Sequence, residues 1–128
     1  MSKQIIQSNK VPAPIGPYSQ AVIANGFLFA SGQIAFNPAI GELVLSSIEA
    51  ETKQVMENIK AILDEANINF DHIVKTSIFL SNMDSFAAVN QVYGSYFNAD
   101  FPARETVAVK TLPRNVNVEI SITALMSL

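Results

Sequence analysis

Arg104 is the side chain in this sequence best suited to binding a small organic acid. It lies in the segment 102–106, which reads Pro-Ala-Arg-Glu-Thr, directly before a predicted strand. A guanidinium at such a junction can hold a carboxylate through two parallel hydrogen bonds from its planar fork. The simpler alternative is a surface ion pair with Glu105 or another neighbour, which would carry no function. The sequence alone leaves both interpretations open.

Glu119 is the carboxylate that could act together with such a clamp. It lies in the polar phase of the last predicted strand, with Asn117, Ser121 and Thr123. A solvated sheet edge is the simpler interpretation. If an oligomer buries that face, however, a carboxylate partly shielded from water becomes a candidate general acid or base.

Three further positions could supply polar contacts, although each also has an ordinary structural explanation. Tyr18 follows a rigid Gly-Pro pair, and its phenol could donate to a ligand or simply pack. Ser31 and Gly32 end a predicted strand, where a glycine exposes backbone N–H groups. Asn90 lies inside a predicted helix and could face either way.

Composition excludes several other kinds of site. The chain has no cysteine, which rules out disulfides, thiolate nucleophiles and cysteine-bound metal or iron–sulfur centres. His72 is the only histidine, so a histidine-rich zinc site is excluded as well. No phosphate loop, dinucleotide fingerprint or metal-ligand spacing is present. We therefore expect neither a metal nor an organic cofactor.

The charge balance argues against a nucleic-acid partner. Eight Lys and Arg against eleven Asp and Glu give a net charge of −3, which is the wrong sign for neutralising phosphates. Only 15% of the residues are charged, whereas soluble domains average about 25%, so another copy of the chain is expected to cover part of the surface. No targeting signal or membrane-length apolar run is visible, which makes the cytoplasm the default location.

Strands and two helices alternate along the sequence. Asn25-Gly26 between two apolar runs predicts a hairpin. Ser46 with Glu49 fits a capping box before a first helix, and Asp84 fits the N-cap of a second. We expect strands at 20–24, 27–31, 43–45 (a short one), 73–80, 106–111 and 117–124, the last two joined by a hairpin connection at 112–116.

These elements predict a single α+β domain that spans residues 1–128. Crossover connections normally place both helices on one face of a mixed sheet, which leaves the second face uncovered. The runs 27–30 and 73–80 are nevertheless apolar on both faces of their strands. We therefore expect a homo-oligomer that packs sheet to sheet. A trimer would close a barrel-like core, and a dimer also fits this reasoning.

Five short motifs occur together between residues 15 and 120. They are Ile15-Gly16-Pro17-Tyr18-Ser19-Gln20-Ala21, Phe29-Ala30-Ser31-Gly32-Gln33-Ile34, Val89-Asn90-Gln91-Val92-Tyr93, Phe101-Pro102-Ala103-Arg104, and Leu112-Pro113 followed by Val118-Glu119-Ile120. In this order and spacing they resemble the RidA family, also called the YjgF family, over nearly the full chain. The resemblance implies a chorismate-mutase-like α+β fold, a homotrimer, and active sites in the clefts between subunits. It also implies cofactor-free hydrolysis of reactive enamines and imines, such as 2-aminoacrylate and 2-iminobutanoate, to 2-keto acids and ammonia.

The resemblance also implies roles for individual residues. Arg104 would hold the substrate carboxylate, and Glu119 would hold the water and return a proton to the imine nitrogen. Tyr18 would help to fix the geometry of the reacting groups. Further substrate contacts are implied at Ser31, Gly32, Asn90 and Thr106.

Two positions depart from the family pattern. Thr106 stands where many members have a cysteine, two residues after the arginine. The family's contacts at this position are implied to be made by the main chain, which threonine supplies equally well, whereas any thiol-based activity is lost. Glu105 replaces a residue that is more commonly small, and it could pair with Arg104.

Two other classes of function stay open at this stage. A sensor would bind 2-keto acids without turnover, and a regulatory or interaction module could act as an RNA-directed translation inhibitor, as other family members are described to do. The net charge of −3 counts against RNA. A sensor needs the arginine clamp but no acid–base group, so the presence of both Arg104 and Glu119 favours turnover.

Overall fold

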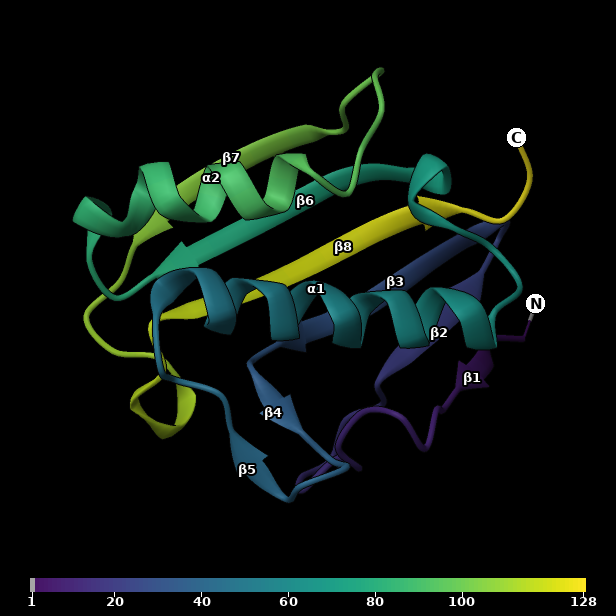
Figure 1. Ribbon diagram of the computed structural model, residues 1–128. Coiled ribbons are helices and arrows are strands. Elements are labelled where there is room, and N and C mark those ends of the chain that lie inside the picture. The colour runs from purple at the N-terminus through teal and green to yellow at the C-terminus, as the bar shows by residue number, and fades with distance from the viewer. Residues whose placement is uncertain (1) are drawn as a thin grey trace.

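The protein forms one six-stranded mixed sheet with two helices packed against one face (Figure 1). The computed structural model describes residues 2–128. The strands and helices are β1 (Gln4–Ile6), β2 (Ala21–Ala24), β3 (Phe27–Gln33), β4 (Phe36–Asn37), β5 (Glu42–Leu43), α1 (Ile48–Glu65), β6 (Ile73–Leu80), α2 (Phe86–Gly94), β7 (Ala103–Ala108) and β8 (Val118–Leu125). The sheet order is β1-β2-β3-β8-β6-β7, and every pair is antiparallel except β6 with β7. This is the α+β architecture with both helices on one face that the sequence predicts.

The first predicted hairpin forms, whereas the last one does not. Asn25 and Gly26 have φ angles of 52° and 82°, which suit the two-residue turn between β2 and β3. The hairpin predicted through 112–116 is wrong, because β8 lies between β3 and β6 and does not pair with β7. The inward side chains of β8 are buried along its whole length, as expected for a central strand with both edges paired.

β7 lies at the edge of the sheet and begins at Ala103, three residues earlier than predicted. It runs parallel to β6, with Arg104 beside Thr76 and Thr106 beside Ile78. Arg104 therefore lies within a strand and not before one. The alternation of the strand consequently fixes the face of the sheet to which its side chain points.

Both predicted helix N-caps are displaced by one or two residues. Ser47, not Ser46, caps α1, and its hydroxyl accepts a hydrogen bond from the backbone N–H of Ala50 at 3.0 Å. Ser85, not Asp84, occupies the N-cap position of α2 and makes no side-chain capping bond. Asn82, two residues before Asp84, caps the turn of 3₁₀ helix that leads into α2, and its side chain accepts from the backbone N–H of Asp84 at 2.8 Å. Neighbouring serines, like asparagine and aspartate, have similar capping preferences, so residue type alone does not choose between them.

Short strands account for the other differences from the sequence pattern. β1 pairs with β2 at one edge of the sheet and has no counterpart among the predicted strands. β4 and β5 form a separate two-stranded sheet, and the strand predicted at 43–45 overlaps β5 only at Leu43. Strands of two or three residues are too short to show a period of two.

The hydrophobic core lies between the sheet and the two helices. α1 buries a face of Val55, Ile59 and Leu63 against inward side chains such as Ile120 of β8. α2 buries Tyr93, whose hydroxyl bonds the Thr76 hydroxyl of β6 at 2.8 Å. Each fully buried Leu- or Ile-sized side chain contributes about 1.5–3 kcal/mol, so this layer holds both helices to the sheet.

A buried carboxylate joins α1 to the beginning of β8. Glu51 is 0% exposed and accepts hydrogen bonds from the backbone N–H groups of Asn117 at 2.7 Å and Val118 at 2.9 Å. The side-chain amide of Asn117 donates a third bond at 2.8 Å. These three donors compensate for removing the carboxylate from water. The contact fixes the backbone immediately before Glu119.

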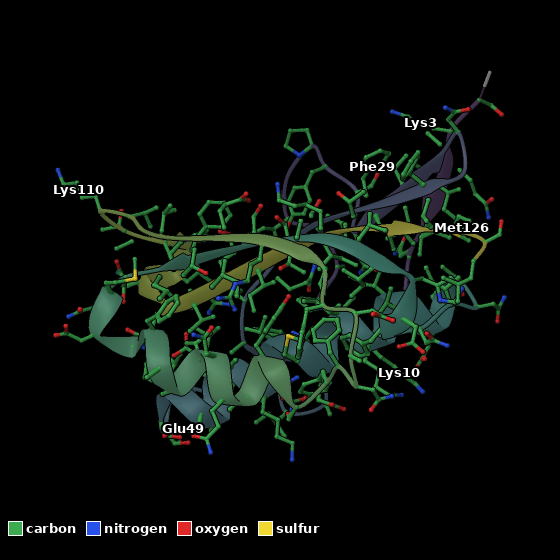
Figure 2. All side chains as sticks on the ribbon, turned by 90° about the horizontal axis from the view of Figure 1, so that it is seen from above. Lys3, Lys10, Phe29, Glu49, Lys110 and Met126 are labelled. Atoms are coloured by element: carbon green, nitrogen blue, oxygen red, sulfur yellow. The ribbon has the colours of Figure 1, made fainter. Side chains whose placement is uncertain are left out.

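The face of the sheet opposite the helices is uncovered, as predicted. Phe29 on β3 and Val107 on β7 are 48% and 41% exposed, and Figure 2 shows Phe29 pointing away from the helix layer. The same face carries an ion pair between Lys75 Nζ and Glu105, at 2.9 Å. An antiparallel sheet that faces water usually carries mainly polar residues there, so the exposed apolar side chains indicate a surface for another protein chain.

Glu51→Ala is expected to lower the free energy of unfolding by about 3 kcal/mol or more, because it leaves three donors without their acceptor. Glu65→Ala changes an exposed glutamate of the same helix and serves as the matched control. The control should change stability by less than about 0.5 kcal/mol. Urea denaturation followed by circular dichroism measures both variants, and equal losses would contradict the role given to Glu51.

Candidate active site

Neutral groups of α2 hold Arg104. Its Nη1 donates a hydrogen bond to Asn90 Oδ1 at 2.6 Å. Its guanidinium carbon lies 5.2 Å from the ring centroid of Tyr93 and 5.6 Å from that of Phe86. Aromatic faces attract a cation without using its N–H donors. The guanidinium is therefore oriented while most of its donors stay available for a ligand.

The alternative interpretation of Arg104, an ion pair with Glu105, is wrong. Successive side chains of a strand point to opposite faces, and Glu105 contacts Lys75 and accepts a hydrogen bond from the Ser77 hydroxyl on the uncovered face. The hydrogen bond from Ser77 is the main cause that lowers the pKa of Glu105, and the contact with Lys75 lowers this pKa further. Among the described residues, no carboxylate lies within ion-pair distance of Arg104.

A cavity of about 390 Å³ opens beside the arginine. Arg104 and Asn90 line it together with Tyr93, Phe101 and Pro102. Its walls combine one cation with a hydrogen-bonding amide and aromatic rings, which suits a small carboxylate.

Thr106 lies two residues beyond Arg104 on the same face of β7. Its hydroxyl oxygen is buried and has no hydrogen-bond partner within residues 2–128. Because β7 is an edge strand, alternate peptide groups point away from the sheet and are open to a partner. The main-chain contact implied for Thr106 is compatible with this position.

Glu119 lies on the uncovered face of β8, against Gly32 of β3. Burial raises the pKa of its half-buried carboxyl group above the ordinary glutamate value. A Cβ on residue 32 would lie 2.6 Å from Glu119 Oε2 and 2.8 Å from Glu119 Cδ. Both distances are shorter than the non-bonded contacts that Cβ atoms make in proteins. Glycine at this position therefore allows the carboxylate to lie directly against the backbone of β3.

Tyr18 and Ser31 lie close to Gly32. The Ser31 hydroxyl donates to the carbonyl of Ser19 at 2.6 Å, which ties the end of β3 to the loop that carries Tyr18. Tyr18 and Ser31 line a cavity of about 590 Å³. Tyr18 and Gly32 line a second cavity of about 500 Å³. Tyr18 is 53% exposed, so its phenol is accessible to a ligand.

The structure separates the predicted site residues into two groups. Arg104 is level with Thr76 and Ile122, whereas Glu119 is level with Phe79. Two strand spacings and three residues along the sheet place the backbones of Arg104 and Glu119 roughly 14 Å apart, and their side chains point to opposite faces. One chain therefore does not bring the arginine to the glutamate. We call Asn90, Arg104 and Thr106 the arginine group, and Tyr18, Ser31, Gly32 and Glu119 the glutamate group.

Phe86 and Tyr93, which are not among the predicted site residues, form the aromatic platform under Arg104. Both share a helix face with Asn90, because they lie four residues before it and three residues after it. An amide flanked by aromatic residues at this spacing is a signal that could have indicated a cation-binding face.

Within residues 2–128, no three His, Cys, Asp or Glu side chains gather as a metal-binding group. No helix of that part is long and apolar enough to cross a membrane.

Comparison with known proteins identifies the family. A family model described as Endoribonuclease L-PSP matches residues 8–126. A RutC family protein from Synechocystis is 47% identical, with 98% of each chain covered. A goat protein named 2-iminobutanoate/2-iminopropanoate deaminase is 43% identical, with 95% of this chain and 89% of the goat protein covered. This chain belongs to the RidA/YjgF family.

A solved structure agrees with this assignment. The Rid family protein YyfA from Yersinia pestis is 47% identical and superposes with a TM-score of 0.94, covering 97% of this chain and 99% of the other. The resemblance to the RidA family carried by the five sequence motifs is thereby confirmed. Family membership supports an enzyme that acts on a small molecule.

Gly32→Ala is expected to return the pKa of Glu119 toward the ordinary glutamate value, because the new Cβ pushes the carboxylate away from β3 and exposes it. Gly94→Ala is the control, since a Cβ there meets no atom within 4 Å. Carboxyl carbon NMR titration measures the pKa of Glu119. If Gly32→Ala and wild type titrate identically, the close approach of residue 32 does not position Glu119.

Proposed function

We propose that this protein hydrolyses 2-imino acids and their enamine tautomers, such as 2-iminobutanoate and 2-aminoacrylate, to 2-keto acids and ammonia. The observation that carries the proposal is an oriented guanidinium held by neutral groups, in the same fold as a half-buried carboxylate of raised pKa. The goat relative with a deaminase name supports the same reaction class.

Arg104 binds the substrate through its carboxylate. A 2-imino acid carries one carboxylate directly beside the electrophilic C=N carbon, so holding the carboxylate also positions the reacting carbon. The fork of the guanidinium donates hydrogen bonds to both carboxylate oxygens in one plane, and Asn90, Tyr93 and Phe86 fix that plane. The oriented substrate then needs only a placed water and a proton carrier.

Glu119 places the water and moves the protons. As the water oxygen forms a bond to the imine carbon, one proton passes to Glu119 and the C=N bond becomes single. Glu119 gives this proton to nitrogen, which yields an amino alcohol. It then carries the hydroxyl proton of that intermediate to nitrogen as well, so that the C–N bond breaks, ammonia leaves, and the C=O bond of the 2-keto acid forms. A raised pKa suits both steps, because the carboxyl group gains and loses its proton closer to neutral pH.

The remaining residues supply fixed polar contacts around the reacting atoms. The backbone N–H groups at the end of β3 and the outward peptide groups of β7 are the groups in position to do so. The exposed phenol of Tyr18 lines the same cavity as Gly32 at the end of β3. The residues concerned are Ser31, Gly32, Thr106 and Tyr18.

A complete site requires two copies of the chain. The arginine group lies at the β7 edge of the sheet, and the glutamate group lies on the uncovered face. A second copy packed on that face can bring its own β7 edge to Glu119, and burying Phe29 would stabilise the contact. Such a contact joins two different surfaces, and a contact of this kind generates a ring when the rotation between copies closes. The homotrimer implied by the family is a ring in which every interface holds one site.

A coupled assay tests the reaction directly. A pyridoxal-dependent dehydratase generates 2-iminobutanoate, and the release of 2-ketobutyrate is timed with and without this protein. The proposal predicts faster release in its presence. Binding of 2-ketobutyrate without any acceleration would contradict turnover and would indicate a sensor of small carboxylates.

Arg104→Lys is expected to lower the rate of 2-iminobutanoate hydrolysis by about 10²-fold or more, because lysine keeps the charge but loses the planar two-point contact that orients the substrate. The fold and the oligomer should remain, since Arg104 is exposed and is not part of the core. Steady-state kinetics and circular dichroism of wild type, Arg104→Lys and Arg104→Ala measure these effects. A lysine variant as active as wild type would rule out the two-point clamp.

A further inference from the structure

The cavity of about 500 Å³ beside Gly32 contains a charge that the reaction described above does not use. Arg114 lines this cavity together with Tyr18 and Gly32. All the other lining residues are neutral, and several are apolar, among them Val11, Ile15 and Ile34. A cavity with apolar walls and a single positive charge favours a ligand with a short apolar body and an anionic end.

Arg114 is held in place by the fold. It has a φ of 56° and is followed by Asn115 with a φ of 57°, a left-handed conformation that bulky residues seldom adopt. Its guanidinium carbon lies 5.5 Å from the ring centroid of Phe36. Phe36 is itself anchored, because the amide of Asn58 donates to its carbonyl at 2.9 Å.

The guanidinium of Arg114 is not neutralised within the described chain. No carboxylate of residues 2–128 lies within ion-pair distance of it, although the chain as a whole carries an excess of acidic residues. A strained backbone that presents an uncompensated cation to a cavity is the kind of feature that a binding role explains.

Arg114 and Glu119 belong to the same end of β8. The loop that carries Arg114 leads directly into this strand, and it lies beside β4 at the lower left of Figure 1. Gly32 contacts the carboxylate of Glu119 and also lines the cavity. A ligand whose reacting carbon lies at Glu119 can therefore extend its side chain past Gly32 toward Arg114.

We infer that Arg114 is a specificity-determining residue for substrates whose side chain ends in a second carboxylate. The inference rests on the proposed function, because it places the reacting carbon of the substrate at Glu119. The ligand class is that of 2-imino acids derived from acidic amino acids, and the recognition is a charge-assisted contact between the Arg114 fork and the distal carboxylate.

The test compares an acidic and a neutral substrate in matched variants. Flavin-dependent oxidases generate 2-iminoglutarate and 2-iminobutanoate from the corresponding amino acids, and kcat/KM is measured for each. Arg114→Met keeps an unbranched aliphatic side chain, and it must adopt the same positive φ as arginine, but it removes the charge. Lys110→Met removes one charge from an exposed position that does not line the cavity. Circular dichroism confirms that both variants fold.

The measured quantity is the ratio of kcat/KM for the acidic substrate to kcat/KM for the neutral one. Arg114→Met should lower this ratio by about tenfold or more, as expected for a lost charge-assisted contact, and Lys110→Met should leave it unchanged. Equal ratios in the two variants would overturn the role of Arg114 while leaving the proposed hydrolysis intact.

A binding measurement separates this inference from the proposed reaction. Calorimetry compares 2-oxoglutarate with 2-oxobutanoate, which are stable and need no turnover. Tighter binding of 2-oxoglutarate that is lost in Arg114→Met supports recognition of the distal carboxylate by Arg114, and a failure of wild type to hydrolyse either imine would then overturn the proposed function separately. Equal affinity of wild type and Arg114→Met for 2-oxoglutarate would overturn the role of Arg114.

Discussion

Successive side chains of a strand point to opposite faces of a sheet, and only one face of this sheet is covered by helices. This constraint determines the environments of Arg104, Glu105 and Glu119. Arg104 points toward α2 and lies over aromatic rings, whereas its neighbour Glu105 points to the uncovered face and pairs with Lys75. Glu119 lies on that same uncovered face, where Gly32 lets its carboxylate rest against the backbone. Arginine and glutamate are therefore kept apart within one chain.

The arginine group and the glutamate group carry opposite charges, and neither charge is paired within the described chain. Arg104 has no carboxylate partner among the described residues, and Glu119 has a raised pKa because burial is not offset by a nearby cation. In the proposed assembly, a second copy on the uncovered face would bring Arg104 and Glu119 into one site and would cover exposed apolar side chains as well. Glu51 contributes at a distance, because it fixes the backbone from which Glu119 projects. Folding, assembly and chemistry in this account consequently depend on the same central strand.

The sequence predicted the parts of the fold that have strong local signals, namely the Asn25-Gly26 turn, both helices, the strand at 73–80 and the uncovered face. The predictions from sequence failed where strand pairing or a side-chain partner depends on residues far away in the chain. Whether β8 pairs with β7 or inserts between β3 and β6 depends on the packing of the whole sheet. The partner of Glu105 was missed because Lys75 and Ser77 come from another strand. Family motifs indicated the seven candidate site residues, but only the three-dimensional structure shows that they form two separate groups.

The central claim is that one site takes Arg104 from one copy and Glu119 from another, and subunit complementation tests it most directly. Arg104→Ala and Glu119→Gln, each inactive alone, are unfolded together in equal amounts and refolded as mixed oligomers, whose mass is checked by light scattering against the 13.9 kDa of one chain. If neighbouring copies share each site, random mixing restores both native residues in about a quarter of the sites. Such mixed oligomers should therefore recover about a quarter of wild-type activity. Mixed oligomers that remain as inactive as the separate variants would contradict it.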